Sequence, residues 1–387
     1  MSVPFDARKP ATAFDHTTTL VSVLELSEKS WQMGASVPGV CRRPLRKIDV
    51  RDIDAVLKAV QQWKSEASKA GHSVSRVVLG YEAGRDGFWL ARALREHGIE
   101  VYVIHPASIA VERRGRRAKT DRIDVDMLLG TLLGWLRGEP RRCTMAPIPT
   151  EAEEDMREPG REREALVTAR LKTENQIGSQ LIRFGIADFR PRLKKAAQKL
   201  EELRTFDGRP LPPKSMEKLR RLMAQHRLLS EQMKEIEEAR QQVVMVRHPN
   251  HLEKMIQMLV RIVGLGVETA TLLVHEVFSR KFRDRKALAA FVGLTGTPFN
   301  SGGSAREQGI SKNGNPRVRR MVTQLMWRWL KFQPGSALAR WFEARTGGAK
   351  GRIRKIMAIA LARKLLVALW RYVEDGVIPE GARLAAT

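Results

Sequence analysis

Cysteine and long apolar runs are what this 387-residue sequence most conspicuously lacks. Its two cysteines, Cys41 and Cys143, are too few for a disulfide framework or a zinc site, and they suit a reducing compartment. No apolar run is long enough for a membrane span, and the N-terminus has no apolar core typical of a signal peptide. We therefore expect a cytoplasmic protein of two or three globular domains.

Acidic residues are also scarce, because 43 Asp and Glu stand against 69 Lys and Arg, which gives a formal net charge of +26. The net charge is +7 over 1–150, +3 over 151–245 and +16 over 246–387. Basic side chains bind phosphates and release counterions, so this excess favours a nucleic-acid partner over a membrane surface. A generally Arg-rich composition is the alternative, but the nearly balanced middle stretch argues against it. The main nucleic-acid surface is expected in the C-terminal third.

The first 150 residues alternate between strand and helix patterns after a loose tail over 1–18. Predicted strands cover 20–26, 31–37, 74–81 and 100–104, and predicted helices cover 53–70, 88–97 and 121–136. Such alternation predicts an α/β domain with a mixed sheet over 19–150.

Strand patterns disappear between 151 and 246, where charged residues of both signs alternate with apolar residues at helical spacing. The pattern is interrupted near Pro191 and at 208–213. It predicts a helical connector, which could be a coiled-coil hairpin or dimerisation arm, or else a solvated helical bundle. The spacing alone does not separate these two alternatives.

The region 247–387 is expected to be mainly helical. Residues 262–267 and a predicted helix over 268–278 resemble a helix-hairpin-helix, in which Gly264 and Gly266 would let backbone N–H groups approach a phosphate. A loop is predicted over 294–312, and helices over 316–332, 337–345 and 352–374. We expect Trp327, Trp329 and Trp341 in the helix core rather than on a base-stacking surface.

Four acidic residues fall where predicted strands and helices meet. Glu25 ends the first strand, and Glu82 ends the strand before a glycine-rich turn. Asp121 and Asp124 begin a helix, and their i, i+3 spacing puts them on one face. Because strand ends and a helix start can converge, the four predict a carboxylate site for Mg²⁺ that is suited to phosphoryl transfer.

Each acid also has a structural alternative. Asp121 and Asp124 could favour the helix dipole, Glu82 could pair with Arg85, and Glu25 could be a solvated strand end. Their occurrence together, beside a basic run, favours the metal site. That run is a predicted phosphate-binding stretch, with a solvated turn as its alternative, and its basic residues are Arg113, Arg114, Arg116, Arg117 and Lys119.

Two blocks of sequence carry a family resemblance. The first comprises residues 81–84, 102–106 and 119–124, and the second comprises 293–298, 301–302, 307–312 and 314–320. Over most of 20–375 the chain resembles the DEDD transposases of bacterial insertion sequences, the insertion-sequence one-ten family of bridge-RNA-guided recombinases. The resemblance implies an RNase H-like (RuvC-like) mixed-sheet domain over 19–150, a helical connector over 151–246 and a mainly helical transposase domain over 247–387.

The resemblance also implies functional roles. Ser301 would attack DNA and form a phosphoserine link, although Ser304 and Ser311 would be equal candidates without the family pattern. Mg²⁺ would be held by the four acids, and the family has aspartate where this chain has Glu25. The implied partners are DNA, a structured guide RNA and further copies of the chain, in a dimer or tetramer with composite sites. Phosphate contacts are expected from Arg306, Lys312, Arg317, Arg319 and Arg320.

Two other functions stay open on the sequence alone. A Holliday-junction resolvase-like nuclease would use metal-activated water, so it would cleave DNA without Ser301 and leave no covalent adduct. A non-catalytic nucleic-acid-binding protein would show no Mg²⁺-dependent activity, and the glutamate at position 25 is its best support.

Overall fold

The computed structural model describes residues 10, 12–84, 87–109, 121–139, 142–301, 304–312 and 314–385, without the side chains of 107, 121, 298–301 and 304–308. The chain divides into two compact units, Met1–Ala152 and Glu153–Thr387. The predicted connector and C-terminal region both fall in the second unit, almost in full. Most of the predicted tail lies outside the described residues.

A six-stranded mixed sheet forms the centre of the first unit. Its spatial order is β3-β2-β1-β4-β5-β6. β1, β4 and β5 are parallel, whereas β2, β3 and β6 pair antiparallel with their neighbours. The predicted mixed sheet is confirmed. The strands are β1 (Thr19–Glu25), β2 (Trp31–Ser36), β3 (Leu45–Ile48), β4 (Arg76–Glu82), β5 (Glu100–Ile104) and β6 (Met145–Ala146).

Helices cover both faces of this sheet, which explains the continuous apolar strands. Leu20 and Leu24 of β1 pack in one core with α1 (Ile53–Lys69) and α2 (Trp89–Glu96). Val21 and Val23 point to the other face and pack in a second core with α3 (Asp121–Leu136). All three helices were predicted, and α3 begins and ends where the sequence pattern placed it.

Two glycines let α3 approach the sheet closely. A Cβ added to Gly34 of β2 would lie 2.3 Å from Cγ1 of Val125, and one added to Gly80 of β4 would lie 2.8 Å from Cδ2 of Leu132. Both glycines pair in register with Val23 of the intervening strand. The helix therefore crosses three strands at the level of Val23, two residues before Glu25.

This close approach predicts that Gly34→Ala destabilises the protein by about 1–3 kcal/mol, because the new methyl group would overpack against the branched Val125 side chain. The matched control is Gly130→Ala on α3, where an added Cβ would meet no atom within 4 Å. That substitution should stabilise the helix by about 0.5–1 kcal/mol. Urea unfolding of both variants measures the difference, and equal midpoints would contradict the packing.

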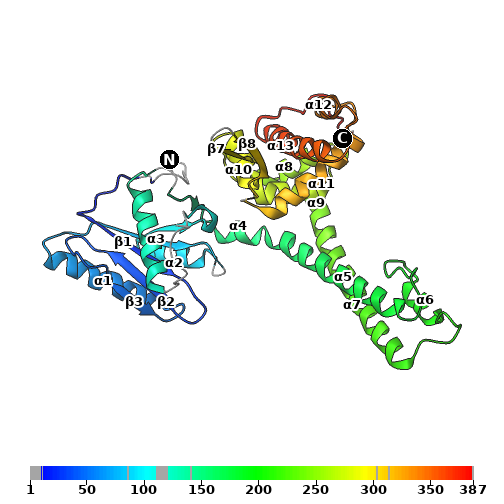
Figure 1. The fold of residues 1–387 in the computed structure, drawn as a ribbon, viewed down its shortest axis with the longest axis horizontal. Coiled ribbons are helices and arrows are strands. Elements are labelled where there is room, and N and C mark those ends of the chain that lie inside the picture. The colour runs from blue at the N-terminus through cyan, green and yellow to red at the C-terminus, as the bar shows by residue number, and fades with distance from the viewer. Residues whose placement is uncertain are drawn as a thin grey trace. The chain divides into compact units, whose positions relative to one another are not determined.

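The second unit begins with a helical hairpin. α5 (Glu158–Ile182) and α7 (Pro213–Met245) run side by side, and α6 (Ala196–Glu202) lies near their turn (Figure 1). The helices are interrupted between 183 and 195 and between 203 and 212, as predicted. A small core around Ile177, Leu200 and Leu219 holds the turn together. The dimerisation role of this hairpin stays a prediction.

The rest of the second unit is mainly helical, as predicted, and it packs around Leu361, Leu365 and Leu369 of the last helix. The predicted loop over 294–312 is wrong, because most of it forms an antiparallel hairpin. Its Gly, Ser, Thr and Asn residues show no apolar alternation that would indicate strands. The elements are α8 (His251–Val260), α9 (Val267–Leu273), the π-helix η2 (Val274–Phe278), α10 (Arg285–Val292), β7 (Gly296–Ser301), β8 (Ser304–Ile310), α11 (Pro316–Phe332), α12 (Ala337–Thr346) and α13 (Arg352–Asp375).

The three tryptophans of α11 and α12 differ in burial. Trp329 is buried and Trp341 is partly buried against the core, as expected. Trp327 is 45% exposed, so its prediction as a core residue is wrong. Its aromatic ring is available on the surface of α11.

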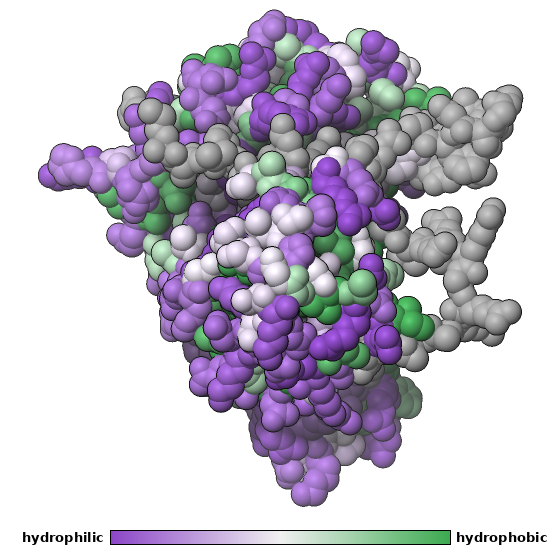
Figure 2. Space-filling model, turned by 90° about the vertical axis from the view of Figure 1, so that its left-hand side faces the viewer, coloured by the Kyte–Doolittle hydropathy of each residue, from purple (hydrophilic) through white to green (hydrophobic). Residues whose placement is uncertain are grey.

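Among the described residues, no helix is both long and apolar enough to cross a bilayer. Figure 2 shows that hydrophilic residues dominate the visible surface and that apolar residues form only small, separate patches.

Candidate active site

Two of the predicted acids lie side by side at one edge of the sheet. Glu25 ends β1 and Glu82 ends β4. These parallel strands pair Leu24 with Tyr81, so the next position on each strand holds a glutamate. Neighbouring strands are about 4.8 Å apart. The alternation along both strands directs the two carboxylates to the sheet face that α3 covers.

The other two acids lie in the first turn of α3. Asp121 is the first residue of the helix, and its side chain lies outside the described set. Asp124 is partly buried one turn later, on the helix that packs over the face bearing Glu25 and Glu82. Asp126 instead points to Arg43, with 3.6 Å between the carboxylate and guanidinium atoms. The predicted convergence of all four carboxylates stays a prediction.

The available carboxylates fit a hard cation in their donor chemistry. Glu82 and Asp124 are partly buried, yet the carboxylate of neither makes a hydrogen bond or ion pair with another described residue. A carboxylate that has lost part of its water and has no protein partner is costly unless a cation joins it. No group of three His, Cys, Asp or Glu side chains within the described set could hold a metal ion, and Asp121 is not in that set.

The predicted basic run lies in the segment 110–120, outside the described residues. Arg85, the alternative partner of Glu82, also lies outside them. The role of the run in phosphate binding stays a prediction.

Ser301 occupies the far end of the β7–β8 hairpin. It is the last residue of β7, and its backbone pairs with that of Ser304, the first residue of β8. The side chains of Ser301, Ser304 and Arg306 are outside the described set. Ser311 lies at the opposite end, where its hydroxyl accepts a 3.1 Å hydrogen bond from Thr295. Ser311 therefore lies at the opposite end of the hairpin from Ser301 and Ser304.

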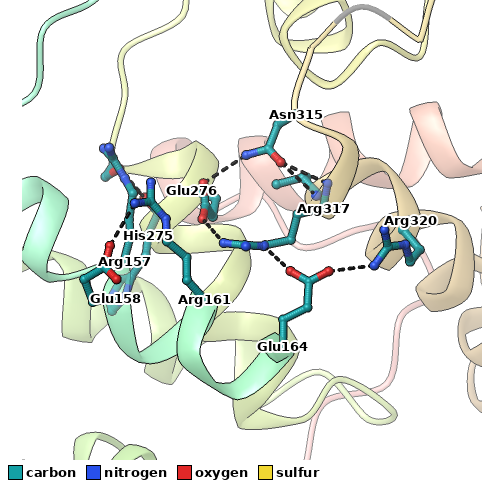
Figure 3. Close-up of polar contacts among 11 residues, drawn as sticks. Arg157, Glu158, Arg161, Glu164, His275, Glu276, Asn315, Arg317 and Arg320 are labelled. Atoms are coloured by element: carbon teal, nitrogen blue, oxygen red, sulfur yellow. Dashed lines mark hydrogen bonds and ion pairs between the residues drawn. The ribbon is translucent and has the colours of Figure 1, made fainter. Parts of the chain in front are cut away.

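The segment after the hairpin is held by a polar network (Figure 3). Asn315 caps α11, because its Oδ1 accepts hydrogen bonds from the backbone N–H groups of Arg317 and Val318 at 3.1 and 3.2 Å. Its Nδ2 donates to Glu276 of η2 at 2.9 Å. The Asn315 side chain therefore both caps α11 and connects this helix to η2 through a hydrogen bond.

Arg317 joins three helices. Its guanidinium lies 3.2 Å from the carboxylate of Glu276 and also donates to the carboxylate of Glu164 on α5. Arg320 approaches the same Glu164 at 2.6 Å (Figure 3). Two carboxylates therefore hold Arg317, which favours a positioning role over phosphate binding for this residue.

The other predicted phosphate ligands of this segment are more accessible. Arg320 keeps 65% of its side chain exposed. Arg319 donates to the backbone carbonyls of Val292 and Lys312 at 3.2 and 2.9 Å, and so ties the hairpin base to α11. Lys312 is exposed.

The predicted helix-hairpin-helix has its turn between α8 and α9. Gly264 has a φ of +93°, and a Cβ there would lie 2.7 Å from Cβ of Phe332. This glycine therefore lets the turn pack against the end of α11. Gly266 is the N-cap of α9, and a Cβ there would meet no atom within 4 Å. Only Gly266 retains open space for an approaching phosphate.

Sequence reasoning missed the two carboxylates that hold Arg317. Glu276 is buried within Val274–Phe278, an otherwise largely apolar run. An acid inside such a run needs a cationic or hydrogen-bonding partner, and this signal could have identified it. Glu164 carries no comparable signal, because it is one of many acids on the charged helix α5.

The network predicts a pH dependence of stability. Burial raises the pKa of Glu164, but the hydrogen bonds and charges of Arg317 and Arg320 outweigh burial, so the pKa lies below its usual 4.5. A lowered carboxylate pKa stabilises the folded state above pH 4.5, and this contribution is lost as the pH falls further. Glu164→Gln should therefore cost about 1–2 kcal/mol at pH 7 and progressively less below pH 4.5.

Urea unfolding of Glu164→Gln between pH 3.5 and 7 measures this effect. Glu231→Gln is the control, because Glu231 lies on α7 in an exposed ion pair with Arg227. If the stability lost in Glu164→Gln did not change with pH, the ion pairs of Glu164 with Arg317 and Arg320 would be contradicted.

Comparisons with known proteins match both parts of the chain. Residues 256–340 match the family described as Transposase IS116/IS110/IS902 family, and residues 45–185 match a transposase family of the DEDD type. A Sinorhizobium fredii protein that carries the transposase name y4rJ is 41% identical over 368 residues, which cover 93% of each chain. The transposase for insertion sequence element IS1328 of Yersinia enterocolitica is 28% identical over 78% of this chain and 85% of its own.

These matches identify the enzyme class. The DEDD family at residues 45–185 covers much of the six-stranded sheet and implies a metal-dependent active site, and transposases bind DNA. The mixed sheet has the strand arrangement expected of an RNase H-like domain. The chain belongs to the IS116/IS110/IS902 family of transposases.

Proposed function

We propose that this transposase exchanges DNA strands at the ends of an insertion sequence through a covalent protein–DNA intermediate, in the bacterial cytoplasm. The hydroxyl oxygen of Ser301 bonds to the phosphorus of a DNA phosphodiester, and one P–O bond to a sugar breaks. The serine proton leaves, and the departing sugar oxygen takes up a proton. The phosphoserine ester conserves the bond, so a sugar hydroxyl of another strand can attack it and release Ser301 without ATP.

The place of Ser301 in the fold supports this role. It ends β7, and Gly302 and Gly303 follow in the sequence. Ser304 shares this end of the hairpin and is the closest competitor.

The carboxylates supply the second part of the proposal. Glu25, Glu82, Asp121 and Asp124 would hold Mg²⁺, which would neutralise the phosphate charge and favour deprotonation of the attacking hydroxyl. The sheet edge orients the first two acids. The packing of α3 on Gly34 and Gly80 fixes the level of the helix that carries the aspartates.

Basic residues are proposed to hold the flanking phosphates, with Arg317 as a positioning residue for α11. An element-encoded structured RNA is proposed to guide the choice of DNA sites. Several copies of the chain would assemble, with the carboxylates of one copy serving the serine of another. The proposed phosphate ligands are Arg113, Arg114, Arg116, Arg117, Lys119, Arg306, Lys312, Arg319 and Arg320, together with the backbone at Gly266.

One observation supports the proposal most directly. In this DEDD transposase the carboxylates of Glu82 and Asp124 are partly buried and have no hydrogen-bond or ion-pair partner among the described residues. The test is to incubate the full chain with end-joined element DNA, the RNA transcribed beside the gene, and Mg²⁺. A DNA-linked protein band that survives denaturation is expected. Cleaved DNA without such a band would instead favour the nuclease with metal-activated water, and no Mg²⁺-dependent reaction would favour the binding protein.

A further inference from the structure

The C-terminal helices have a larger excess of basic over acidic side chains than the rest of the chain. Between Gln308 and Val373 there are 15 Lys and Arg residues and one acid, Glu343. This stretch contains α11, α12 and most of α13. Such an imbalance is unfavourable in isolation, because like charges repel and α13 carries cations in its first turn, where the helix dipole favours acids.

Most of these cations have no carboxylate partner among the described residues. Only Arg317, Arg320 and Arg340 lie within 4.0 Å of a described acid. The remaining basic residues near the start of α13 are therefore available to an anion. They are Arg345, Lys350, Arg352, Arg354 and Lys355.

An exposed aromatic ring lies beside these cations. The guanidinium carbon of Arg354 stands 5.6 Å from the ring centre of Trp327 and 5.9 Å from that of Phe342. Trp327 is 45% exposed, although nearby Trp329 on the same helix is buried. The Arg354 guanidinium lies over the Trp327 ring, so a positive charge stands directly next to the exposed part of the indole.

Two apolar side chains in the first turns of α13 are also exposed. Ile353 and Ile356 are 55% and 50% exposed, and their i, i+3 spacing puts them on one face of α13. Ile353 follows Arg352 and Ile356 follows Lys355, so apolar and basic side chains are interspersed at the start of α13. The combination of cations and an indole matches a ligand with both phosphates and accessible base faces.

We propose that the surface formed by Trp327 and Arg354 binds an unpaired segment of DNA, with a base stacked on Trp327 and phosphates held by the surrounding cations. In a duplex the base faces are covered by their neighbours, so an indole can stack only on an unpaired or unstacked base. DNA is favoured over RNA because the substrate of a transposase is DNA. Strand exchange also requires base pairs next to the cleaved phosphate to open.

This inference rests on the proposed strand exchange, but binding can be measured without it. The full chain carrying Ser301→Ala is titrated into fluorescently labelled oligonucleotides of equal length: oligo(dT), the corresponding RNA, and duplex DNA. Trp327→Ala in this background should weaken oligo(dT) binding by about ten- to a hundredfold and change duplex binding little. Trp327→Phe should retain most of the affinity, because a phenyl ring can still stack.

Leu228→Ala is the matched control, because Leu228 is a similarly exposed apolar residue on α7. It should leave oligo(dT) binding unchanged, and unfolding curves verify that each variant is folded. The proposal would be overturned if Trp327→Ala lost equal affinity for duplex DNA and oligo(dT), or if the protein bound RNA more tightly than DNA. It would also be overturned if Trp327→Ala changed the number of subunits and left the affinity for oligo(dT) unaltered. Failure of the covalent reaction in the parent protein would overturn the serine mechanism and leave this binding result unaffected.

Discussion

Ser301→Ala is expected to abolish the covalent protein–DNA adduct and to lower strand exchange by at least about a thousandfold. Alanine removes the oxygen that we propose as the nucleophile and leaves the β7 backbone otherwise compatible with its pairing. The adduct is measured by denaturing electrophoresis of labelled DNA, and strand exchange by amplification of the recombined junction.

Ser304→Ala and Ser311→Ala are the controls for this prediction. Ser304 shares the same end of the hairpin, and Ser311 lies at its other end in a hydrogen bond with Thr295. Both variants should retain the adduct. An adduct that persists in Ser301→Ala and disappears in Ser304→Ala would identify Ser304, on the facing strand, as the nucleophile. Unchanged strand exchange in all three variants would exclude serine attack.

Glu82→Gln is expected to lower the same reaction by about a hundredfold or more. The substitution keeps the size of the side chain and removes the negative charge that a divalent cation needs. Because the Glu82 carboxylate makes no hydrogen bond or ion pair with another described residue, the folded structure should lose little stability. The measurement is the rate of adduct formation as a function of Mg²⁺ concentration, together with the urea unfolding midpoint.

Asp126→Asn is the matched control for Glu82→Gln. Asp126 lies on the same helix as Asp121 and Asp124, but its carboxylate faces Arg43. This variant should react within about twofold of the parent, since exposed ion pairs contribute little. Comparable losses in Glu82→Gln and Asp126→Asn would show that the reaction responds to general surface charge and not to a specific site.

Much of the first unit could be predicted from sequence because its local patterns agree with its tertiary packing. β5 and α3 begin and end at the predicted residues, since a buried apolar strand and an apolar helix have few alternative placements. β3 and β6 were missed. β3 is short and has two exposed side chains, and β6 has only two residues, so neither shows a periodic pattern.

Several features of the second unit could not be predicted from local sequence patterns. The β7–β8 hairpin was predicted as a loop, because its strands are rich in turn-forming residues. The polar network around Glu276 joins residues far apart in the sequence, so spacing could not reveal it. Trp327 was wrongly placed in the core together with Trp329, although residues two apart on a helix point to nearly opposite sides.

We propose that the carboxylates of the first unit and Ser301 of the second act on one phosphate, within one copy of the chain or between two. The most direct measurement replaces one non-bridging oxygen of that phosphate with sulfur, at the position mapped by the Ser301 adduct. Mg²⁺ binds sulfur poorly whereas Mn²⁺ tolerates it, so the reaction should fail in Mg²⁺ and recover in Mn²⁺. An adduct that forms equally well in both ions, for both sulfur stereoisomers, would contradict a metal at the phosphate that Ser301 attacks.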